Sequence, residues 1–249
     1  MIVVLSGEGP TDLGACTNAL GECVIPEFAP GPMTILVDQI IEAKLGYSLM
    51  DDTPGCYRYL AEKCLQELEQ QRKQDRRNMA LPGKKHAQET GYFYVNAWVL
   101  GEHAQALARR ENDQAIAILF RDTDGTRSTS KGLWEKKWQS MTDGFQRAEL
   151  KERGVPMLPK PKSEAWLLCA AKKQPYQHCA ALEELSGNDD VRDSAKKQLQ
   201  VALNGADSAA EQREWIEQNG VNLDALSDQM PSFCEFFKRL NCALQSVMA

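Results

Sequence analysis

Long hydrophobic runs are missing from this sequence. None of the apolar stretches in its 249 residues approaches the roughly 20 residues that a membrane-spanning helix needs. The N-terminus has no basic region and no cleavage site, and its apolar run of a few residues is too short for a secretory signal peptide. We therefore expect a cytoplasmic protein with no membrane partner.

The cysteine and histidine patterns of metal-binding and redox proteins are missing as well. The eight cysteines form no CxxC motif and no His/Cys spacing typical of a zinc site. We expect most of them to be buried as small hydrophobic side chains in a reducing compartment. His86, His103 and His178 stand apart from one another, so none of the three is assigned a catalytic role.

The sequence also lacks an excess of positive charge and a nucleotide-binding motif. Its 29 basic and 35 acidic residues give a net charge of −6, which argues against a protein that coats nucleic acid nonspecifically. An enzyme with an acidic metal centre and local basic surfaces stays compatible with this charge. No GxxxxGKS or GxxxxGKT motif is present, so any ATPase activity has to come from a separate partner.

Basic residues gather in two segments that are candidates for contacts with DNA or RNA. A nucleic-acid backbone needs such charge whatever its base sequence. A solvated helix face is the alternative interpretation, and the sequence leaves both open. The two groups are Arg72, Lys73, Arg76, Arg77, Lys84 and Lys85, and Arg127, Lys131, Lys136 and Lys137.

Two acidic clusters stand where apolar runs stop. Residues 2–7 are followed by Glu8, and residues 115–121 are followed by Asp122 and Asp124. Short apolar runs that end in glycine and acidic residues are typical of buried parallel strands. Ligand sites of open α/β sheets lie at the carboxyl ends of such strands, so we expect these three acids in one crevice. Carboxylates gathered there need a counter-charge, and Mg²⁺ is the simplest one.

The pattern along the chain predicts an α/β fold, with a parallel sheet flanked by helices on both faces. We expect a catalytic domain over residues 1–173, with a helical insertion at about 30–90, and a helical C-terminal region over 174–249. Residues 15–31 are expected to be irregular. Expected strands are 2–7, 92–100, 115–121 and 155–158; expected helices are 33–45, 55–78, 101–110, 133–153 (with a weak point at Gly144) and 163–173.

Three motifs resemble those of Toprim-fold nucleases. Gly7-Glu8-Gly9-Pro10-Thr11-Asp12 looks like the first Toprim motif, and Asp122-Thr123-Asp124-Gly125 looks like the DxD motif after a later strand. The stretch from Pro159 to Leu168, PKPKSEAWLL, resembles the PxxEAWLL segment of a small Toprim-like family. The similarity is to the Toprim domains of the OLD family and to small stand-alone Toprim-like proteins of bacterial anti-phage systems, and it covers roughly residues 1–14 and 92–170.

The resemblance implies a Toprim-like (Rossmann-like) fold and Mg²⁺- or Mn²⁺-dependent cleavage of DNA or RNA phosphodiesters. Glu8 matches the motif glutamate, which is a metal ligand or a general acid/base. Asp122 and Asp124 match the DxD metal ligands, and Asp12 matches the second acid of the OLD-type first motif. The long segment before the second strand is a departure from compact Toprim domains.

The last motif supplies further candidate residues. Lys160 or Lys162 matches the lysine that OLD-type sites place after the last core strand, where it neutralises charge on the phosphoryl group. Glu164 is a candidate ligand of a second metal ion. The resemblance also implies an anti-phage effector that works with a separate ATPase subunit. In the alternative interpretation the two lysines are solvated residues of a loop, and Glu164 lies in the first turn of a helix because its charge interacts favourably with the helix dipole.

Other functional classes stay open. A non-catalytic Toprim-like subunit that binds an ATPase or nucleic acid would keep the fold but cut nothing; carboxylates splayed apart, or paired with Arg121 or Arg127, would favour it. The run from Asp122 to Thr126 also spells DxDGT, the signature of haloacid-dehalogenase-like phosphatases. There Asp122 is the nucleophile and Asp124 the general acid, with Lys160 and the pair Asp189 and Asp193 in later roles. That interpretation leaves Glu8 without a function.

Overall fold

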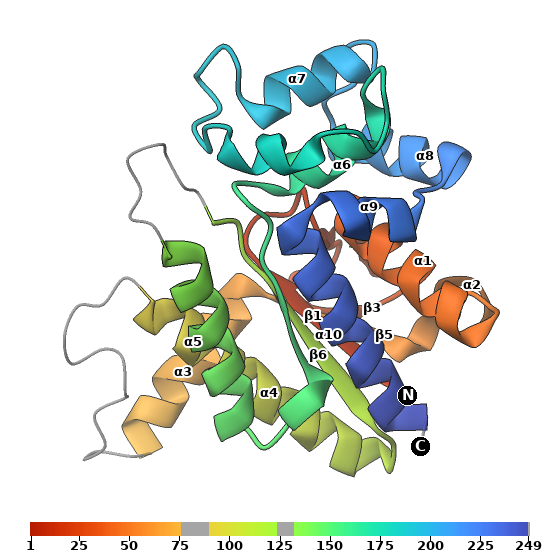
Figure 1. Ribbon diagram of the computed structural model, residues 1–249. Coiled ribbons are helices and arrows are strands. Elements are labelled where there is room, and N and C mark those ends of the chain that lie inside the picture. The colour runs from red at the N-terminus through yellow and green to blue at the C-terminus, as the bar shows by residue number, and fades with distance from the viewer. Residues whose placement is uncertain (76–89, 124–131, 249) are drawn as a thin grey trace.

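Helices flank a mostly parallel five-stranded sheet in this α/β protein (Figure 1). The computed structural model describes residues 1–75, 90–123 and 132–248. Within these ranges no helix has the length and apolar character that crossing a membrane requires. The α/β class and the flanking helices agree with the prediction from the sequence.

The sheet has the strand order β3-β5-β1-β6-β7. The strands β5 (Tyr57–Ala61), β1 (Ile2–Gly7), β6 (Ala115–Phe120) and β7 (Gly154–Met157) run parallel, and only the edge strand β3 (Glu22–Val24) is antiparallel. The last residues of the three central strands are paired side by side. The residues that follow them therefore leave the sheet at one edge, where open α/β sheets place their ligand sites.

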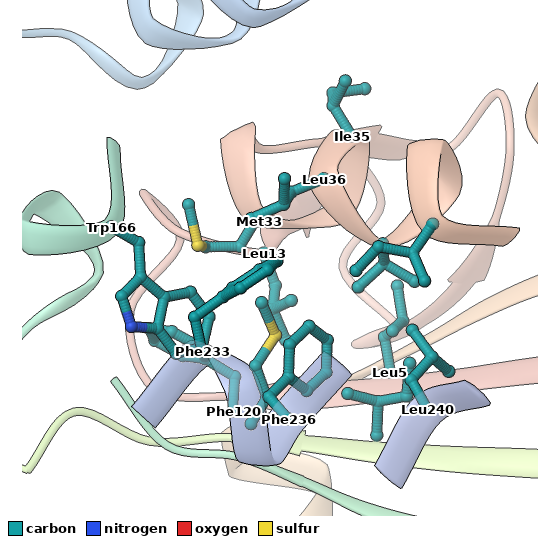
Figure 2. Packing of buried hydrophobic residues seen from close by; sticks show 14 of the residues in the cluster. Leu5, Leu13, Met33, Ile35, Leu36, Phe120, Trp166, Phe233, Phe236 and Leu240 are labelled. Atoms are coloured by element: carbon teal, nitrogen blue, oxygen red, sulfur yellow. The ribbon is translucent and has the colours of Figure 1, made fainter. Parts of the chain in front are cut away.

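The two faces of the sheet carry separate hydrophobic cores because side chains alternate along a strand. Val3 and Leu5 of β1 pack on the face that is covered by the helices α1 (Pro32–Leu45), α6 (Ser163–Ala171) and α10 (Pro231–Met248). Ile2 and Val4 pack on the opposite face, which is covered by α3 (Glu62–Asp75), α4 (Gly91–Glu111) and α5 (Leu133–Arg147). In Figure 2, Trp166 lies among aromatic side chains of α10 and residues of α1. All of β1 is buried, as a central parallel strand requires.

The described residues contain ten α-helices and three short 3₁₀ helices. After β7 the chain is helical, as predicted. The α-helices are α1 (Pro32–Leu45), α2 (Leu49–Asp52), α3 (Glu62–Asp75), α4 (Gly91–Glu111), α5 (Leu133–Arg147), α6 (Ser163–Ala171), α7 (Ala195–Ala202), α8 (Ala209–Asn219), α9 (Leu223–Gln229) and α10 (Pro231–Met248), and the 3₁₀ helices are Pro54–Cys56, Lys151–Arg153 and Cys179–Glu184.

The predicted strand 92–100 is wrong, because this segment belongs to α4. Its aromatic and β-branched residues favour a strand locally, but its buried residues recur at helical spacing at Phe93, Ala97 and Leu100. Packing against α5 decides the outcome. Gly144 allows the two helices to approach closely, since a Cβ there would lie 2.3 Å from the carbonyl oxygen of Tyr94. The helix α5 consequently continues through its expected weak point to Arg147.

The predicted helix 55–78 is wrong over its first part. Residues 57–61 form β5, the neighbour of β1 in the sheet, and a helix begins only at Glu62. The expected helical insertion at about 30–90 therefore contains a central strand. The expectation that residues 15–31 are irregular is also corrected, since they contribute β3 and a two-stranded antiparallel sheet of β2 (Gly14–Cys16) and β4 (Phe28–Pro30).

The cysteines differ from the expectation of mostly buried free thiols. Cys16 is bonded to Cys23, and Cys169 is bonded to Cys179. The cysteines without a disulfide are half-buried or exposed: Cys56, Cys64, Cys234 and Cys242. Disulfides persist mainly in oxidising compartments, so the two bonds weigh against the expected reducing one. Short sequence motifs missed these pairs because the first joins two short strands and the second spans the end of α6 and the next 3₁₀ helix.

Candidate active site

The candidate site lies at the carboxyl edge of the sheet, where four strands end. Gly7 at the end of β1 is paired with Ala61 of β5 and with Phe120 of β6. The next residues along the three chain segments are Glu8, Glu62 and Arg121. The segment after β7 reaches the same edge, because the backbone N–H of Arg121 donates to the carbonyl of Met157 at 3.0 Å.

A chain of hydrogen bonds connects the acids of the first motif with Asp122 of the second. Glu8 Oε1 accepts the backbone N–H of Asp122 at 2.5 Å. Asp122 Oδ1 in turn accepts the backbone N–H of Ser163 at 3.1 Å. The Ser163 hydroxyl donates to Asp12 Oδ1 and lies 3.5 Å from Glu164 Oε2. These bonds link Glu8, Asp12, Asp122 and Glu164, which come from three distant segments of the chain, around the start of α6. A common site for their carboxylates stays a prediction.

The loops around the carboxylates are tied together by the main chain. Thr123 donates its backbone N–H to the carbonyls of Pro159 (3.2 Å) and Pro161 (3.0 Å), and its hydroxyl donates to the carbonyl of Pro159 at 2.6 Å. The ammonium of Lys137 donates to the carbonyl of Thr123 at 2.8 Å. These bonds hold the segment after β6 against the segment that precedes α6, and so fix the spacing between Asp122 and Ser163.

Two of the carboxyl groups are held in an unfavourable environment for charge. Burial raises the pKa of Asp12 above its ordinary value, and the hydrogen bonds from Ser163 and Thr11 and the charge of Lys162 oppose this only in part. Burial also raises the pKa of Glu164, and the negative charge of Asp12 adds to the effect. Like charges close together favour protonation of one of them, or a bound cation.

Arg121 provides positive charge beneath the site. Its side chain is 1% exposed, and Nη1 lies 3.7 Å from Glu8 Oε2 and 3.2 Å from Glu62 Oε1. Nη2 donates to the hydroxyl of Tyr92 at 3.0 Å. Sequence reasoning assigned no role to Glu62 or Tyr92. The signal for Glu62 was present, since an acid follows the apolar end of β5, but the helical interpretation of residues 55–78 concealed it.

The two candidate lysines lie in different surroundings. Lys162 is close enough to lower the pKa values of Asp12 and Glu164, although its ammonium also pairs with Asp189 Oδ1 at 3.0 Å. The ammonium of Lys160 points to Glu184 Oε1 at 2.8 Å. Of the two candidate lysines, Lys162 is thus the one that favours the charged forms of Asp12 and Glu164.

Ser163 is the first residue of α6, and its hydroxyl bonds Asp12 instead of a helix N–H. Several predicted residues lie outside the described ranges, so their placement stays a prediction: Asp124, Arg76, Arg77, Lys84, Lys85, Arg127 and Lys131. Lys137, expected in a basic patch, is buried beside Phe93 with its ammonium 4.9 Å from the ring centre.

The donor chemistry of the site fits a hard divalent cation. Glu8, Asp12, Asp122 and Glu164 offer only carboxylate oxygens, which Mg²⁺ and Mn²⁺ prefer. In the part of the chain that the structure describes, no three His, Cys, Asp or Glu side chains are already close enough to hold a metal ion, and Asp124 lies outside that part. Comparison with protein-family models, with curated proteins and with solved structures found no match.

Proposed function

We propose that the protein is a Mg²⁺- or Mn²⁺-dependent nuclease with a Toprim-like site. The hydrogen-bonded chain from Glu8 through Asp122 and Ser163 to Asp12 is the observation that carries this proposal. It joins the first motif, the DxD motif and the PKPKSEAWLL segment, which the sequence alone could only place in order. A merely structural acid in any one loop does not require the other two motifs beside it.

Each residue has a specific part in this proposal. Glu8 and Asp122, with Asp124, would hold one cation, and Asp12 and Glu164 would complete the acidic end of the site. A bound cation would supply charge neutralisation at the scissile phosphate and would lower the pKa of an attacking water. Lys162 places a positive charge beside Asp12 and Glu164, where it would offset charge that develops on the phosphoryl group.

From the resemblance we infer a DNA or RNA substrate, a separate ATPase subunit as partner and a role in bacterial anti-phage defence. A cytoplasmic location is inferred from the N-terminal sequence and the short apolar runs. The two disulfides argue for testing the location directly. Alkylation of thiols in cells that are acid-quenched and then denatured would decide it: eight free thiols are expected from a reducing cytoplasm, and four where both disulfides persist.

A cleavage assay tests the proposed function. The full chain, with and without an added ATPase partner, is incubated with labelled single- and double-stranded DNA and with RNA in Mg²⁺, Mn²⁺ or a chelator. We expect strand cleavage that the chelator abolishes and that Glu8→Gln lowers by at least about a hundredfold. Glu111→Gln is the matched control, because Glu111 also pairs with an arginine, Arg58, at 3.1 Å but far from the site. Cleavage that is unchanged in Glu8→Gln would refute the proposal.

A non-catalytic nucleic-acid-binding or ATPase-binding subunit is the second candidate. The contact of Arg121 with Glu8 at 3.7 Å is the observation that favours it, because in this candidate the guanidinium provides the counter-charge that a metal ion would otherwise supply. This candidate predicts binding of partner or nucleic acid that neither a chelator nor Glu8→Gln changes. Metal-dependent cleavage by the wild type excludes it.

A further inference from the structure

Arg121 is a buried cation for which the proposed chemistry has no direct use. Its side chain is 1% exposed, although it directly precedes Asp122 at the open edge of the sheet. Burying an arginine is costly unless anions and acceptors around it compensate. Three partners from three different elements surround it: Glu8 after β1, Glu62 at the start of α3, and Tyr92 in α4.

Arg121, Tyr92 and Glu62 form a closed ring of contacts. Arg121 Nη2 donates to the Tyr92 hydroxyl at 3.0 Å, and Nη1 lies 3.2 Å from Glu62 Oε1. The Tyr92 hydroxyl donates to this same oxygen of Glu62. The guanidinium carbon also lies 4.8 Å from the centre of the Tyr92 ring, a favourable cation–π distance. The head of Arg121 is therefore fixed by two residues that are independent of Glu8.

Glu8 is farther from Arg121 than Glu62 is. The 3.7 Å between Arg121 Nη1 and Glu8 Oε2 exceeds the length of a hydrogen bond, while Glu8 Oε1 accepts the N–H of Asp122 at 2.5 Å. An ionised carboxylate has about four acceptor positions. A close Arg121–Glu8 pair would place a hydrogen bond on Oε2. At the observed distance the guanidinium attracts Oε2 electrostatically but does not form a hydrogen bond with it.

We propose that Glu62 and Tyr92 are positioning residues: they hold the Arg121 guanidinium at a distance from which it orients Glu8 without blocking its carboxylate. This inference rests on the proposed metal-dependent function, in which Glu8 holds a cation. Glu62 acts as the nearer counter-ion of Arg121. When its charge is removed, Glu8 is the acidic partner of Arg121 that remains among the described contacts, and it forms the close pair that competes with the metal ion.

The first test measures Mn²⁺ binding to the full chain, by electron paramagnetic resonance, and cleavage of the nucleic acid that the wild type cuts. We expect Glu62→Gln to weaken Mn²⁺ binding by roughly tenfold to a hundredfold, the usual size of the effect of changing a ligand's outer partners, because Arg121 then pairs closely with Glu8 and competes with the metal ion. Tyr92→Phe removes one hydroxyl from the ring of contacts and should act in the same direction. Glu111→Gln breaks a comparable pair with Arg58 at 3.1 Å and should leave both quantities unchanged.

A double variant distinguishes the orientation of Glu8 by Arg121 from competition between Arg121 and the metal ion for Glu8. Glu62→Gln with Arg121→Gln removes the counter-ion and the cation together. We expect Mn²⁺ affinity to recover to near the wild-type value, because Arg121 then no longer competes for Glu8. The value of kcat is expected to stay low, since Glu8 is no longer oriented. Circular dichroism checks the fold of each variant, and Tyr92→Phe keeps the test valid if the double variant does not fold.

The outcomes of these measurements decide whether Glu62 and Tyr92 position Arg121. Unchanged Mn²⁺ affinity and unchanged kcat in both Glu62→Gln and Tyr92→Phe would overturn the positioning role, and so would tighter Mn²⁺ binding in Glu62→Gln. A folded double variant that binds Mn²⁺ as weakly as Glu62→Gln would show that Arg121 does not compete for Glu8. A wild type that binds no Mn²⁺ and cleaves nothing refutes the proposed function as well, whereas an active wild type with indifferent variants refutes the positioning role alone.

Discussion

Replacing Asp12 by asparagine tests the electrostatic description of the site. Asparagine is nearly isosteric, and its side-chain oxygen can still accept the hydroxyl of Ser163, so the change removes mainly the charge. Asp12 and Glu164 both lie beside the Ser163 hydroxyl, which is 3.5 Å from Glu164 Oε2. A separation of about 6 Å and an effective dielectric constant of about 20 give a repulsion of roughly 3 kcal/mol.

Nearby lysines reduce this repulsion. Lys162 and Lys196 both favour the charged form of Asp12, so we expect a net destabilisation by its charge of about 1 kcal/mol in the absence of metal ions. For a chain of this size, a gain of that amount raises Tm by about 2–4 °C. The variant should therefore melt higher than the wild type at pH 7 in a chelator.

The pH dependence of the Tm difference between Asp12→Asn and the wild type is an independent test of whether the charge of Asp12 destabilises the fold. Burial raises the pKa of Asp12 above its ordinary 3.8, so protonated Asp12 favours the fold below pH 3.8, and this contribution is lost as the pH rises through the raised value. The advantage of Asp12→Asn should thus be present at pH 7 and vanish near pH 3.5. Saturating Mg²⁺ should stabilise the wild type more than the variant.

Asp113→Asn is a control for which the loss of a carboxylate charge should lower Tm at neutral pH rather than raise it. The N-terminal ammonium, 2.6 Å from Asp113 Oδ2, lowers the pKa of this carboxyl group, so its charge favours the fold at neutral pH. Differential scanning calorimetry in a chelator, from pH 3.5 to 7, measures all three proteins. A Tm of Asp12→Asn that falls at pH 7, or an effect that does not change with pH, would refute the reasoning.

Three further predictions concern the other carboxylates, the reaction and the packing. Glu8→Gln and Asp122→Asn should abolish metal-dependent cleavage with changes in Tm of no more than a few degrees; a large fall would show that these acids are structural. Beryllofluoride should leave Asp122 unmodified, and a generic phosphomonoester should not be hydrolysed, because a nuclease forms no aspartyl-phosphate; turnover without strand cleavage would favour the phosphatase interpretation. Gly144→Ala should cost about 1–3 kcal/mol in calorimetry, because its Cβ would lie 2.3 Å from the Tyr94 carbonyl oxygen, while Gly55→Ala, which meets nothing within 4 Å, should cost far less.

The parts of the fold that local pattern determines were predicted correctly. The strands β1 and β6 are continuous apolar runs bounded by acids, so their type, and the proximity of Glu8 to the backbone of Asp122, followed from the sequence. The strand β5 is different, because it is short and runs directly into α3. Its residues also fit the helical periodicity of α3, and only its pairing with β1 and β3 makes it a strand.

Contacts between residues that are far apart in the chain could not be predicted from the sequence. Arg121 was visible as the residue before the DxD motif, but its contacts with Glu62 and Tyr92 depend on α3 and α4 packing beside β1. The strand predicted at 92–100 would have placed Tyr92 in the sheet. The roles of these residues became visible only with the correct second strand and the correct helix.

The chain of hydrogen bonds at the site also has a consequence for how the protein folds. The bond from Asp122 to Glu8 joins positions 114 residues apart, and the bond from Ser163 to Asp12 joins positions 151 residues apart. Contacts at such separations form slowly, because the chain between them must first be ordered. A nascent or partly folded chain therefore carries the acidic motifs without the assembled site, which comes into being only when β1, β6 and β7 have all found their register.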